Sequence, residues 1–383
     1  MEYTTFSQPR VGSTDMWLWL CSIPDITRSQ IAQVLSVFDS PDEAFTAPEN
    51  EYKALMSGSR TPIWLRNLLS RRNDDFLSLV HAELNDKEIS FVSCEDPGYP
   101  HRFSACPDPP FGLFYRGSLP DDSIKTAAIV GSRACTAYGT SMATAISRLL
   151  TEQGVSIISG MAAGIDAASQ RAALECSGRS YGVFGCGVDI CYPTSNIELY
   201  DTLPAAGGII SEYPCGTPPL SHNFPLRNRI ISALSDLVII IEARKKSGAL
   251  ITADAALEQG KEVYALPGRC TDMLSFGCNR LISQGAGIII TPEEFAAHLQ
   301  ETGFLNEPGG SSESRPGKDT AFNVSDPDLR RILSRLSETP VSPEAICKAT
   351  GMSITAVLTG LMDLQLQGAI REISKNRYVR SVT

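Results

Sequence analysis

Hydrophobic residues recur along this chain with two different spacings, and the change between them divides the sequence into regions. Between about residues 16 and 84, apolar side chains such as Trp17 and Leu20 recur at helical intervals. This spacing predicts a bundle of short helices with close connections. Two further helical stretches of the bundle are expected over residues 41–45 and 62–84.

From residue 126 onward, short and uniformly apolar runs alternate with amphipathic helical segments. Such runs are typical of a parallel sheet that helices cover on both faces. The predicted strands are residues 126–130, 155–158, 181–184, 208–210, 237–241, 263–266 and 287–290. Because the carboxyl ends of parallel strands meet at one edge, we expect the turns after these strands to form one ligand-binding rim.

The composition of the last part of the chain changes at two points. A stretch rich in Gly, Ser, Pro and Glu has little to bury, which predicts a flexible linker. Three apolar-periodic helices, with a tight turn at Gly351 and a terminal hairpin, then form the pattern of a winged helix. Eight basic and six acidic side chains after residue 322 leave open whether this module contacts DNA or protein. The predicted organisation is a helical domain (1–86), a sheet domain that begins with a turn-rich connector (87–300), a linker (301–322) and a winged helix (323–383).

Composition narrows the choice of ligand and compartment. A length of 383 residues with 43% hydrophobic content suits two or three domains. The net charge of -10 means that a nucleic-acid site must be a local concentration of Arg and Lys. Eleven cysteines without a Cys-x-x-Cys pair, and four dispersed histidines, indicate reduced thiols and no zinc site. With no signal-peptide pattern and no long apolar stretch, we expect a cytoplasmic protein without membrane contact, metal or cofactor.

Small and basic residues gather in the turns that follow the predicted strands. The triplet Gly131-Ser132-Arg133 comes directly after residues 126–130. A glycine turn before a helix leaves backbone N–H groups free to bind phosphate, and the arginine adds a planar fork of donors. The candidate contacts for a phosphodiester ligand are Gly131, Ser132, Arg133, Ser159, Gly160, Arg227, Asn228, Arg229, Lys245, Lys246, Ser247 and Asn279.

Two of these candidates, Arg227 and Arg229, flank an asparagine just before an apolar helical segment. Cations are unfavourable at the start of a helix, so a bound anion would resolve the conflict. Internal pairing of either arginine with Glu212 or Glu242 explains the pattern equally well. The sequence leaves both roles open, including one arginine in each.

The usual catalytic arrangements are missing from the sequence. It has no phosphate-binding P-loop and no Gly-x-Ser-x-Gly elbow. Asp166 and Glu212 are a possible acid–base pair, although a helix N-cap and a salt-bridge partner explain them more simply. We therefore expect a binding protein rather than an enzyme.

An ordered set of motifs then points to a family. The motifs are residues 128–133 with 138–139, 159–166, 187–189 with 192–193, 210–214, 224–231, 242–243 with 247–252, 267–268, and 279–282 with 285–286. This set resembles the DNA-processing protein A family, also called DprA or Smf. The resemblance implies a non-enzymatic, extended Rossmann-like domain that binds single-stranded DNA, forms homodimers and helps to load the RecA recombinase in natural transformation and recombination.

The resemblance extends to the outer modules and to single residues. The N-terminal module resembles a sterile-alpha-motif-like or helix-hairpin-helix-like domain, and the C-terminal module resembles a winged helix. By motif, the resemblance assigns the family's phosphate-contacting role most securely to Arg133. Arg227 and Arg229 come next, followed by Lys245 and Lys246.

Two positions depart from the family pattern: Ala163 stands where a basic residue is usual, and Gln170 where a histidine is usual. Both departures remove potential phosphate donors, so we expect weaker binding or binding concentrated on the arginines. Phe224 or Tyr213 is expected to offer a stacking platform for bases.

Two other functions compete with DNA binding. One is a Rossmann-like hydrolase acting on nucleoside monophosphates, whose relatives carry a Pro-Gly-Gly-x-Gly-Thr turn; here the sequence after Pro267-Gly268 continues Arg269-Cys270. The other is a scaffold whose terminal modules contact proteins.

Overall fold

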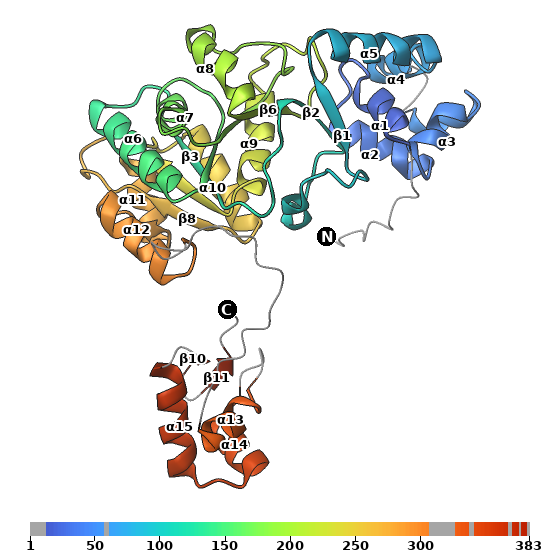
Figure 1. The fold of residues 1–383 in the computed structure, drawn as a ribbon. Helices are drawn as coiled ribbons and strands as arrows, with labels where there is room; N and C mark the ends of the chain where they lie inside the picture. The colour runs from blue at the N-terminus through green and yellow to red at the C-terminus, as the bar shows by residue number, and fades with distance from the viewer. Residues whose placement is uncertain are drawn as a thin grey trace. The chain divides into compact units, whose positions relative to one another are not determined.

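The computed structural model describes residues 13–56, 61–305, 326–336, 341–366, 370–374 and 377–380. The chain divides into two compact units, Met1–Pro308 and Gly309–Thr383, and each is considered by itself (Figure 1). Most of the linker expected over residues 301–322 falls outside the described residues. Within the described ranges, no helix is long and apolar enough to cross a membrane.

The N-terminal part of the first unit is a bundle of short helices, as the sequence predicts. Its helices are α1 (Thr14–Cys21), α2 (Arg28–Val37), α3 (Pro41–Thr46), α4 (Ile63–Ser70) and α5 (Asp74–Asp86). The stretch 62–84 forms two helices because Asn73 starts a new one: its side chain accepts a hydrogen bond from the backbone N–H of Phe76 at 2.9 Å.

A nine-stranded sheet forms the centre of the first unit, in the order β1-β2-β6-β5-β4-β3-β7-β8-β9. The strands are β1 (Ser90–Ser93), β2 (Gly112–Gly117), β3 (Thr126–Gly131), β4 (Ser156–Ser159), β5 (Ser180–Phe184), β6 (Gly207–Ser211), β7 (Leu237–Ile241), β8 (Glu262–Ala265) and β9 (Gly287–Ile288). The seven predicted strands are confirmed, and they pair with one another in parallel.

Two strands that the sequence did not predict flank the turn-rich connector, whose turn formers occupy residues 95–100 and 106–110. These strands, β1 and β2, extend the sheet beyond β6 by antiparallel pairing. The sheet is therefore mixed. These two strands are short and lie among Pro and Gly residues, so their apolar positions give no clear strand pattern.

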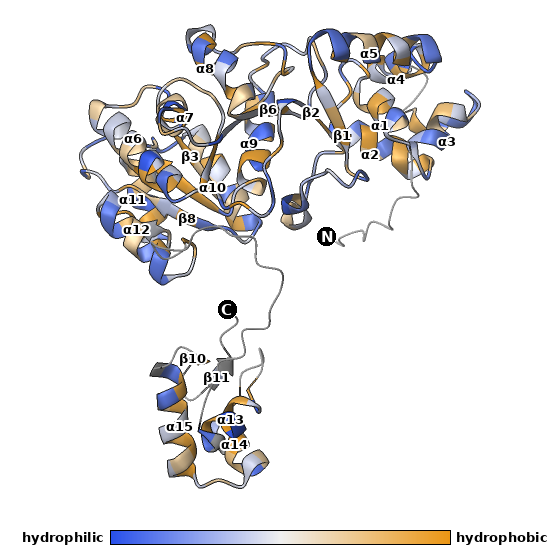
Figure 2. Cartoon of the chain, viewed as in Figure 1, coloured by the Kyte–Doolittle hydropathy of each residue, from blue (hydrophilic) through white to orange (hydrophobic). Residues whose placement is uncertain are grey.

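Helices cover both faces of the parallel strands because successive side chains of each strand point to opposite sides. Ala127 and Ile129 of β3 pack in the cluster of α6 (Ala137–Glu152), α7 (Ile165–Glu175) and α12 (Pro292–Glu301). Ala128 and Val130 pack instead with α9 (Asn223–Ala233), α10 (Gly248–Glu258) and α11 (Phe276–Ser283). The central strands are accordingly coloured as hydrophobic in Figure 2.

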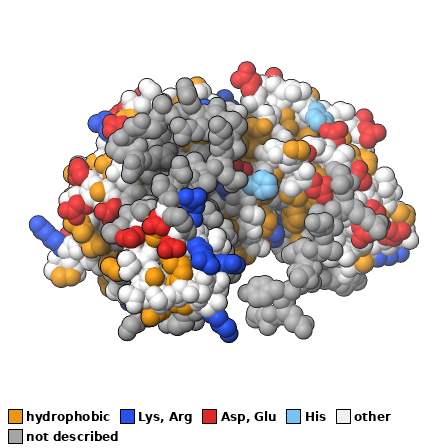
Figure 3. Space-filling model, turned by 60° about the horizontal axis from the view of Figure 1, so that its bottom comes forward, with side chains coloured by type: hydrophobic (Ala, Val, Ile, Leu, Met, Phe, Trp, Pro, Cys, Tyr) orange, Lys and Arg blue, Asp and Glu red, His pale blue; other side chains and the backbone are white. Residues whose placement is uncertain are grey.

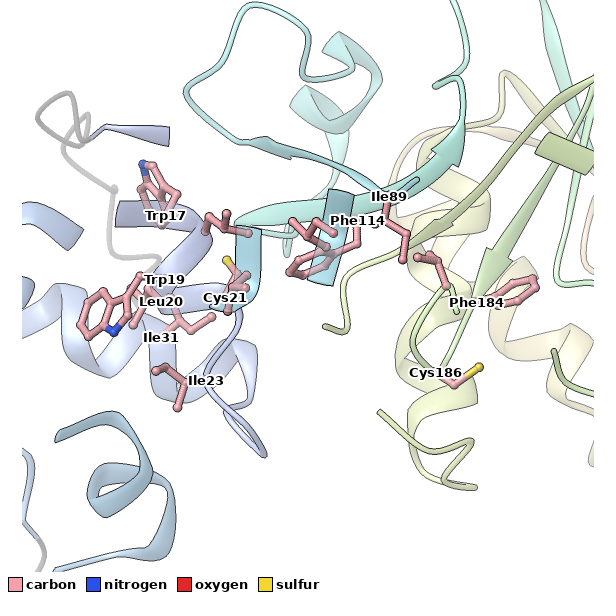
Figure 4. Packing of buried hydrophobic residues seen from close by; sticks show 14 of the residues in the cluster. Trp17, Trp19, Leu20, Cys21, Ile23, Ile31, Ile89, Phe114, Phe184 and Cys186 are labelled. Atoms are coloured by element: carbon pink, nitrogen blue, oxygen red, sulfur yellow. The ribbon is translucent and has the colours of Figure 1, made fainter. Parts of the chain in front are cut away.

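The helical bundle and the sheet share one hydrophobic cluster. It runs from Trp17 in α1 through Ile89 and Phe114 to Phe184 and Cys186 at the end of β5 (Figure 4). Trp17 also donates a hydrogen bond from its indole nitrogen to Glu95 at 2.9 Å. The bundle is therefore packed directly against the edge of the sheet.

The second unit contains the predicted three helices and hairpin. These are α13 (Pro327–Leu333), α14 (Pro343–Thr350), α15 (Ile354–Leu366) and the antiparallel strands β10 (Ile370–Ser374) and β11 (Arg377–Arg380). Gly351 makes the predicted turn between α14 and α15 with a φ of 72°, a left-handed conformation that favours glycine.

Candidate nucleic-acid interface

The order in which the chain adds strands to the sheet reverses between β3 and β7. The chain builds outward from β3 through β4 and β5 to β6 on one side, and from β7 to β8 and β9 on the other. In parallel sheets, ligands bind in the crevice at the carboxyl ends of the strands where the order reverses. A cavity of about 440 Å³ lies at this place, and we call it the rim pocket.

Residues from five parts of the chain line the rim pocket. They come from β3 and the turn after it, the loop before α7 with its first turn, the loop after β5, α9 with the loop before it, and the loop after β7 with the start of α10. The polar and charged ones are Ser132, Arg133, Asp166, Tyr192, Ser221, Arg227, Asn228, Arg244, Lys246, Ser247 and Thr252. The expected convergence of turns on one edge is thus confirmed for β3 and β7.

The rim pocket concentrates positive charge on an otherwise acidic protein. Arg133, Arg244 and Lys246 are exposed, and within the described ranges none of them has an ion pair. Ser247 caps α10, so the positive end of that helix dipole also lies at the pocket. On the face shown in Figure 3, acidic and basic side chains lie close together.

Arg227 is a buried cation in the wall of the pocket, only 4% exposed. Its guanidinium donates to the backbone carbonyl of Gly160 at 3.1 Å and to that of Val183. A Cβ at Gly160 would lie 2.6 Å from the guanidinium, so a larger residue there would displace the Arg227 side chain. Burial lowers the pKa of Arg227 to about 10, so the group still carries its charge at neutral pH.

The charge of Arg227 is only partly compensated by the protein. In the described part of the chain no carboxylate lies within ion-pair distance of Arg227, and its buried Nε has no hydrogen-bond partner. Asp166 is buried nearby and accepts from the backbone N–H of Gly160 at 3.1 Å. Burial raises the pKa of Asp166, although the charge of Arg227 acts in the opposite direction. A bound anion would supply the missing compensation.

Two aromatic rings border the same pocket. Tyr192 and Phe224 are stacked with ring centroids 5.4 Å apart and an interplanar angle of 26°. The Arg133 guanidinium lies 5.4 Å from the centroid of the Phe224 ring. Phe224 is one of the two platforms that the sequence predicts, whereas Tyr213 does not line the pocket. Tyr192 was missed, although it stands within one of the family-like motifs.

The structure brings seven of the twelve sequence-predicted contact residues together in the rim pocket: Gly131, Ser132, Arg133, Arg227, Asn228, Lys246 and Ser247. Gly160 lines a smaller adjoining cavity of about 200 Å³ together with Arg133 and Arg227.

Three other predicted residues make internal contacts. Ser159 is buried and donates to the carbonyl of Ile129 at 2.6 Å. Asn279 exchanges hydrogen bonds with the backbone of Gly268 at 2.9 and 3.1 Å. The ammonium group of Lys245 lies 5.8 Å from the centroid of the Phe276 ring.

Arg229 takes the internal role that the sequence left open. Its guanidinium contacts Glu212 at 2.6 Å and Asp108 at 3.5 Å, and it does not line the rim pocket. The expected position of the helix also needs correction: α9 begins at Asn223, so Arg227 lies in its second turn rather than before it. The conflict with the helix dipole, which suggested an anion, is therefore weaker than the sequence implied.

The two departures from the family pattern lie in different environments. Gln170 is fully buried, where its side chain accepts from the N–H of Met161 and donates to the carbonyl of Tyr181, both at 3.1 Å. Gln170 therefore supplies no donor to the rim pocket. Ala163 does line the adjoining cavity beside Arg133.

One group of potential metal ligands occurs in the described part of the chain: Glu83, Asp189 and Cys215, whose ligand atoms lie within 4.8 Å of one another. The Lys87 ammonium already contacts Glu83 at 2.6 Å and Asp189 at 2.8 Å. Burial raises the pKa of the Cys215 thiol to about 12, which keeps it protonated. These groups therefore form a lysine-bridged contact between α5 and the loop after β5.

Comparison with known proteins identifies similar chains. Residues 90–300 match the model of the family described as DNA recombination-mediator protein A, and residues 316–374 match the DprA winged helix domain. Protein Smf of Escherichia coli K12 is 37% identical over 380 residues, which cover 96% of each chain. DNA processing protein DprA of Streptococcus pneumoniae is 35% identical over 275 residues, 72% of this chain and 94% of the relative.

Solved structures agree with these matches. The X-ray structure of DprA from Streptococcus pneumoniae has 33% sequence identity and a TM-score of 0.61, and the match covers 75% of this chain and 98% of that one. A structure of DNA processing protein A from Helicobacter pylori, described as showing a unique single-stranded DNA binding mode, has 31% identity and a TM-score of 0.51. That match covers 56% of this chain and 98% of the other.

Proposed function

Because this chain belongs to the DNA recombination-mediator protein A family, we propose that it binds single-stranded DNA in the rim pocket without reading the base sequence and without cleaving the strand. The observation that carries the proposal is the buried guanidinium of Arg227, which lines the pocket with no carboxylate at ion-pair distance among the described residues. The DNA-binding description of the Helicobacter pylori relative supports the same ligand.

The pocket offers separate partners for the two parts of a nucleotide. Arg133, Arg244 and Lys246 are placed to neutralise backbone phosphates, and the start of α10 adds the positive end of its helix dipole. The stacked rings of Tyr192 and Phe224 offer a face to a base. Stacking tolerates any base, so this arrangement favours binding that is independent of sequence.

We further propose that the protein acts as a homodimer and passes the bound strand to the RecA recombinase. The family description as a recombination mediator supports this step. Size measurement in solution tests the dimer, and retention of purified RecA on immobilised protein, with and without an oligonucleotide, tests the partner. A monomer, or no retention in either condition, would contradict the corresponding part of the proposal.

The binding itself is tested by substitution of Arg133. We expect Arg133→Ala to weaken binding of a single-stranded oligonucleotide about tenfold and to lower the slope of log K against log salt by about 0.7, the contribution of one phosphate contact. Fluorescence anisotropy over a salt series measures both. The control is Arg179→Ala, which removes another exposed arginine just before β5, at the opposite end of the strands. Equal effects of the two substitutions would contradict the role of Arg133 as a phosphate contact.

A further inference from the structure

A second and larger hollow adjoins the rim pocket. Its volume is about 1070 Å³, and it lies between the start of α6 and the loop after β8. Arg244 lines both the rim pocket and this hollow, so the two form one continuous surface. We call the second cavity the side hollow.

The side hollow differs chemically from the rim pocket. Its two arginines, Arg244 and Arg269, are matched by two acids, Glu242 and Asp272. The rest of its wall is largely apolar, with Leu266, Pro267, Leu274, Tyr138 and Met273, of which Tyr138 is 53% and Met273 71% exposed. A surface with balanced charge and exposed apolar groups suits a nucleobase better than a phosphate.

The local structure holds Tyr138 in place at this surface. Glu242 accepts hydrogen bonds from the backbone N–H of Thr136 at 2.8 Å and from its hydroxyl. Thr136 in turn caps α6 by accepting from the N–H of Gly139 at 3.1 Å. A Cβ at Gly139 would lie 2.5 Å from the Glu242 carboxyl group, so only glycine allows this contact.

The backbone of Glu242 is strained in this arrangement. Its φ of 57° is in the left-handed region, which is unfavourable for a residue with a side chain. Strained residues that are held by specific contacts concentrate at ligand sites. Here the hydrogen bonds between Glu242 and Thr136 hold the end of β7 against the start of α6. Tyr138 lies two residues after Thr136, in the first turn of α6.

The opposite wall is also fixed by side-chain contacts. Asn279 of α11 accepts from the backbone N–H of Gly268 and donates to its carbonyl, which holds the turn after β8. This turn carries Pro267 and Arg269 into the wall of the hollow. Asn279, a predicted contact residue, is therefore a positioning residue for this wall.

We propose that the side hollow is a base-binding subsite for the same single strand that occupies the rim pocket. The strand passes Arg244, which contacts a phosphate between the two cavities, and one or more of its bases stack on Tyr138. This inference rests on the proposed function, because the rim pocket is what brings the strand to the hollow. It extends the footprint of the strand toward α11.

The test pairs a change in the protein with a change in the strand. Oligothymidylates of one length, each with a single abasic position moved along the strand, are bound to the wild type, Tyr138→Ala and Tyr138→Phe. We expect Tyr138→Ala to bind the unmodified strand about tenfold more weakly and Tyr138→Phe to bind within about twofold of the wild type. We expect one abasic position to weaken the wild type similarly and to cost Tyr138→Ala nothing further, because the base and the ring act as a pair.

The outcomes separate the two proposals. If Tyr138→Ala binds as tightly as the wild type while Arg133→Ala is weakened, the subsite is wrong and the rim pocket stands. If each abasic position weakens binding by Tyr138→Ala as much as it weakens binding by the wild type, no base stacks on Tyr138, and the subsite is again wrong. If the wild type does not bind the oligonucleotide, both proposals fail. Tyr138 is exposed, so unchanged circular dichroism and thermal midpoint are expected for both variants.

Discussion

The two faces of helix α9 carry the same residue type in opposite electrostatic settings. On the face toward the rim pocket, Arg227 is buried and contacts backbone carbonyls. On the other face, Arg229 contacts the carboxylates of Glu212 and Asp108. Two residues along a helix amount to a rotation of about 200°, which is enough to separate the two settings. The difference shows that the ligand site of this acidic protein is marked by cations without a carboxylate partner, rather than by the number of cations.

The largest expected effect, on both stability and DNA affinity, comes from replacing Arg227 on the face of α9 that lines the rim pocket. Arg227→Met leaves the carbonyls of Gly160 and Val183 without their donor and the buried Asp166 without a nearby cation. We expect the free energy of unfolding to fall by about 3 kcal/mol and single-strand affinity to fall at least about tenfold. Urea unfolding and fluorescence anisotropy measure the two effects.

A folded Arg227→Met variant that kept wild-type affinity would remove Arg227 from the DNA site. Circular dichroism at the temperature of the binding experiment shows whether the variant is folded. Arg227→Lys serves as the matched control, because it keeps a charge but loses the planar group that reaches two carbonyls. We expect it to recover part of the affinity and little of the stability.

A substitution on the opposite face of α9, at Arg229, is expected to lower the stability of the protein without changing its affinity for DNA. Burial acts to lower the pKa of Arg229, but the Glu212 carboxylate outweighs burial, and the pKa is raised. Arg229→Met leaves Glu212 as an unpaired and largely buried charge, so we expect a loss of about 3 kcal/mol in the free energy of unfolding. Affinity for single strands should remain within about twofold of the wild type, because the pocket keeps its cations.

The double variant Arg229→Met with Glu212→Met sharpens this result. Removing both charges of a buried pair is less harmful than removing one, so we expect the double variant to regain much of the lost stability. An affinity loss in Arg229→Met as large as that in Arg227→Met would show that the two faces are not functionally distinct.

The sequence predicted the parallel strands and the rim because each depends on a local signal. An apolar run followed by a glycine turn, as at residues 126–131, identifies a strand and its carboxyl end without knowledge of the fold. Sequence order then places several such ends on one edge. Arg133, Lys246 and Ser247 were predicted in this way and line the rim pocket.

The sequence did not decide which contacts form between distant residues. The role of Arg229 depends on Glu212 and Asp108, and that of Arg227 on the carbonyls of Gly160 and Val183. These partners belong to other segments and become neighbours only in the fold. Strands β1 and β2 likewise gain their hydrogen bonds from each other and from β6, and their own residues give a weak pattern. The side hollow at Tyr138 has the turn after β8 as its other wall. The sequence placed this turn on the same edge of the sheet but did not show that it faces the start of α6.

The smallest expected effect distinguishes two adjacent lysines. Both Lys245 and Lys246 are exposed, but only Lys246 lines the rim pocket, whereas Lys245 lies over the Phe276 ring. We expect Lys246→Ala to weaken single-strand binding about threefold and to lower the salt slope by about 0.7, since one phosphate contact is lost. Lys245→Ala removes the same charge one residue away and should leave the slope unchanged. Because bulk attraction would treat both lysines alike, equal slopes for the two variants would show that the protein binds DNA by a diffuse field rather than by contacts in the pocket.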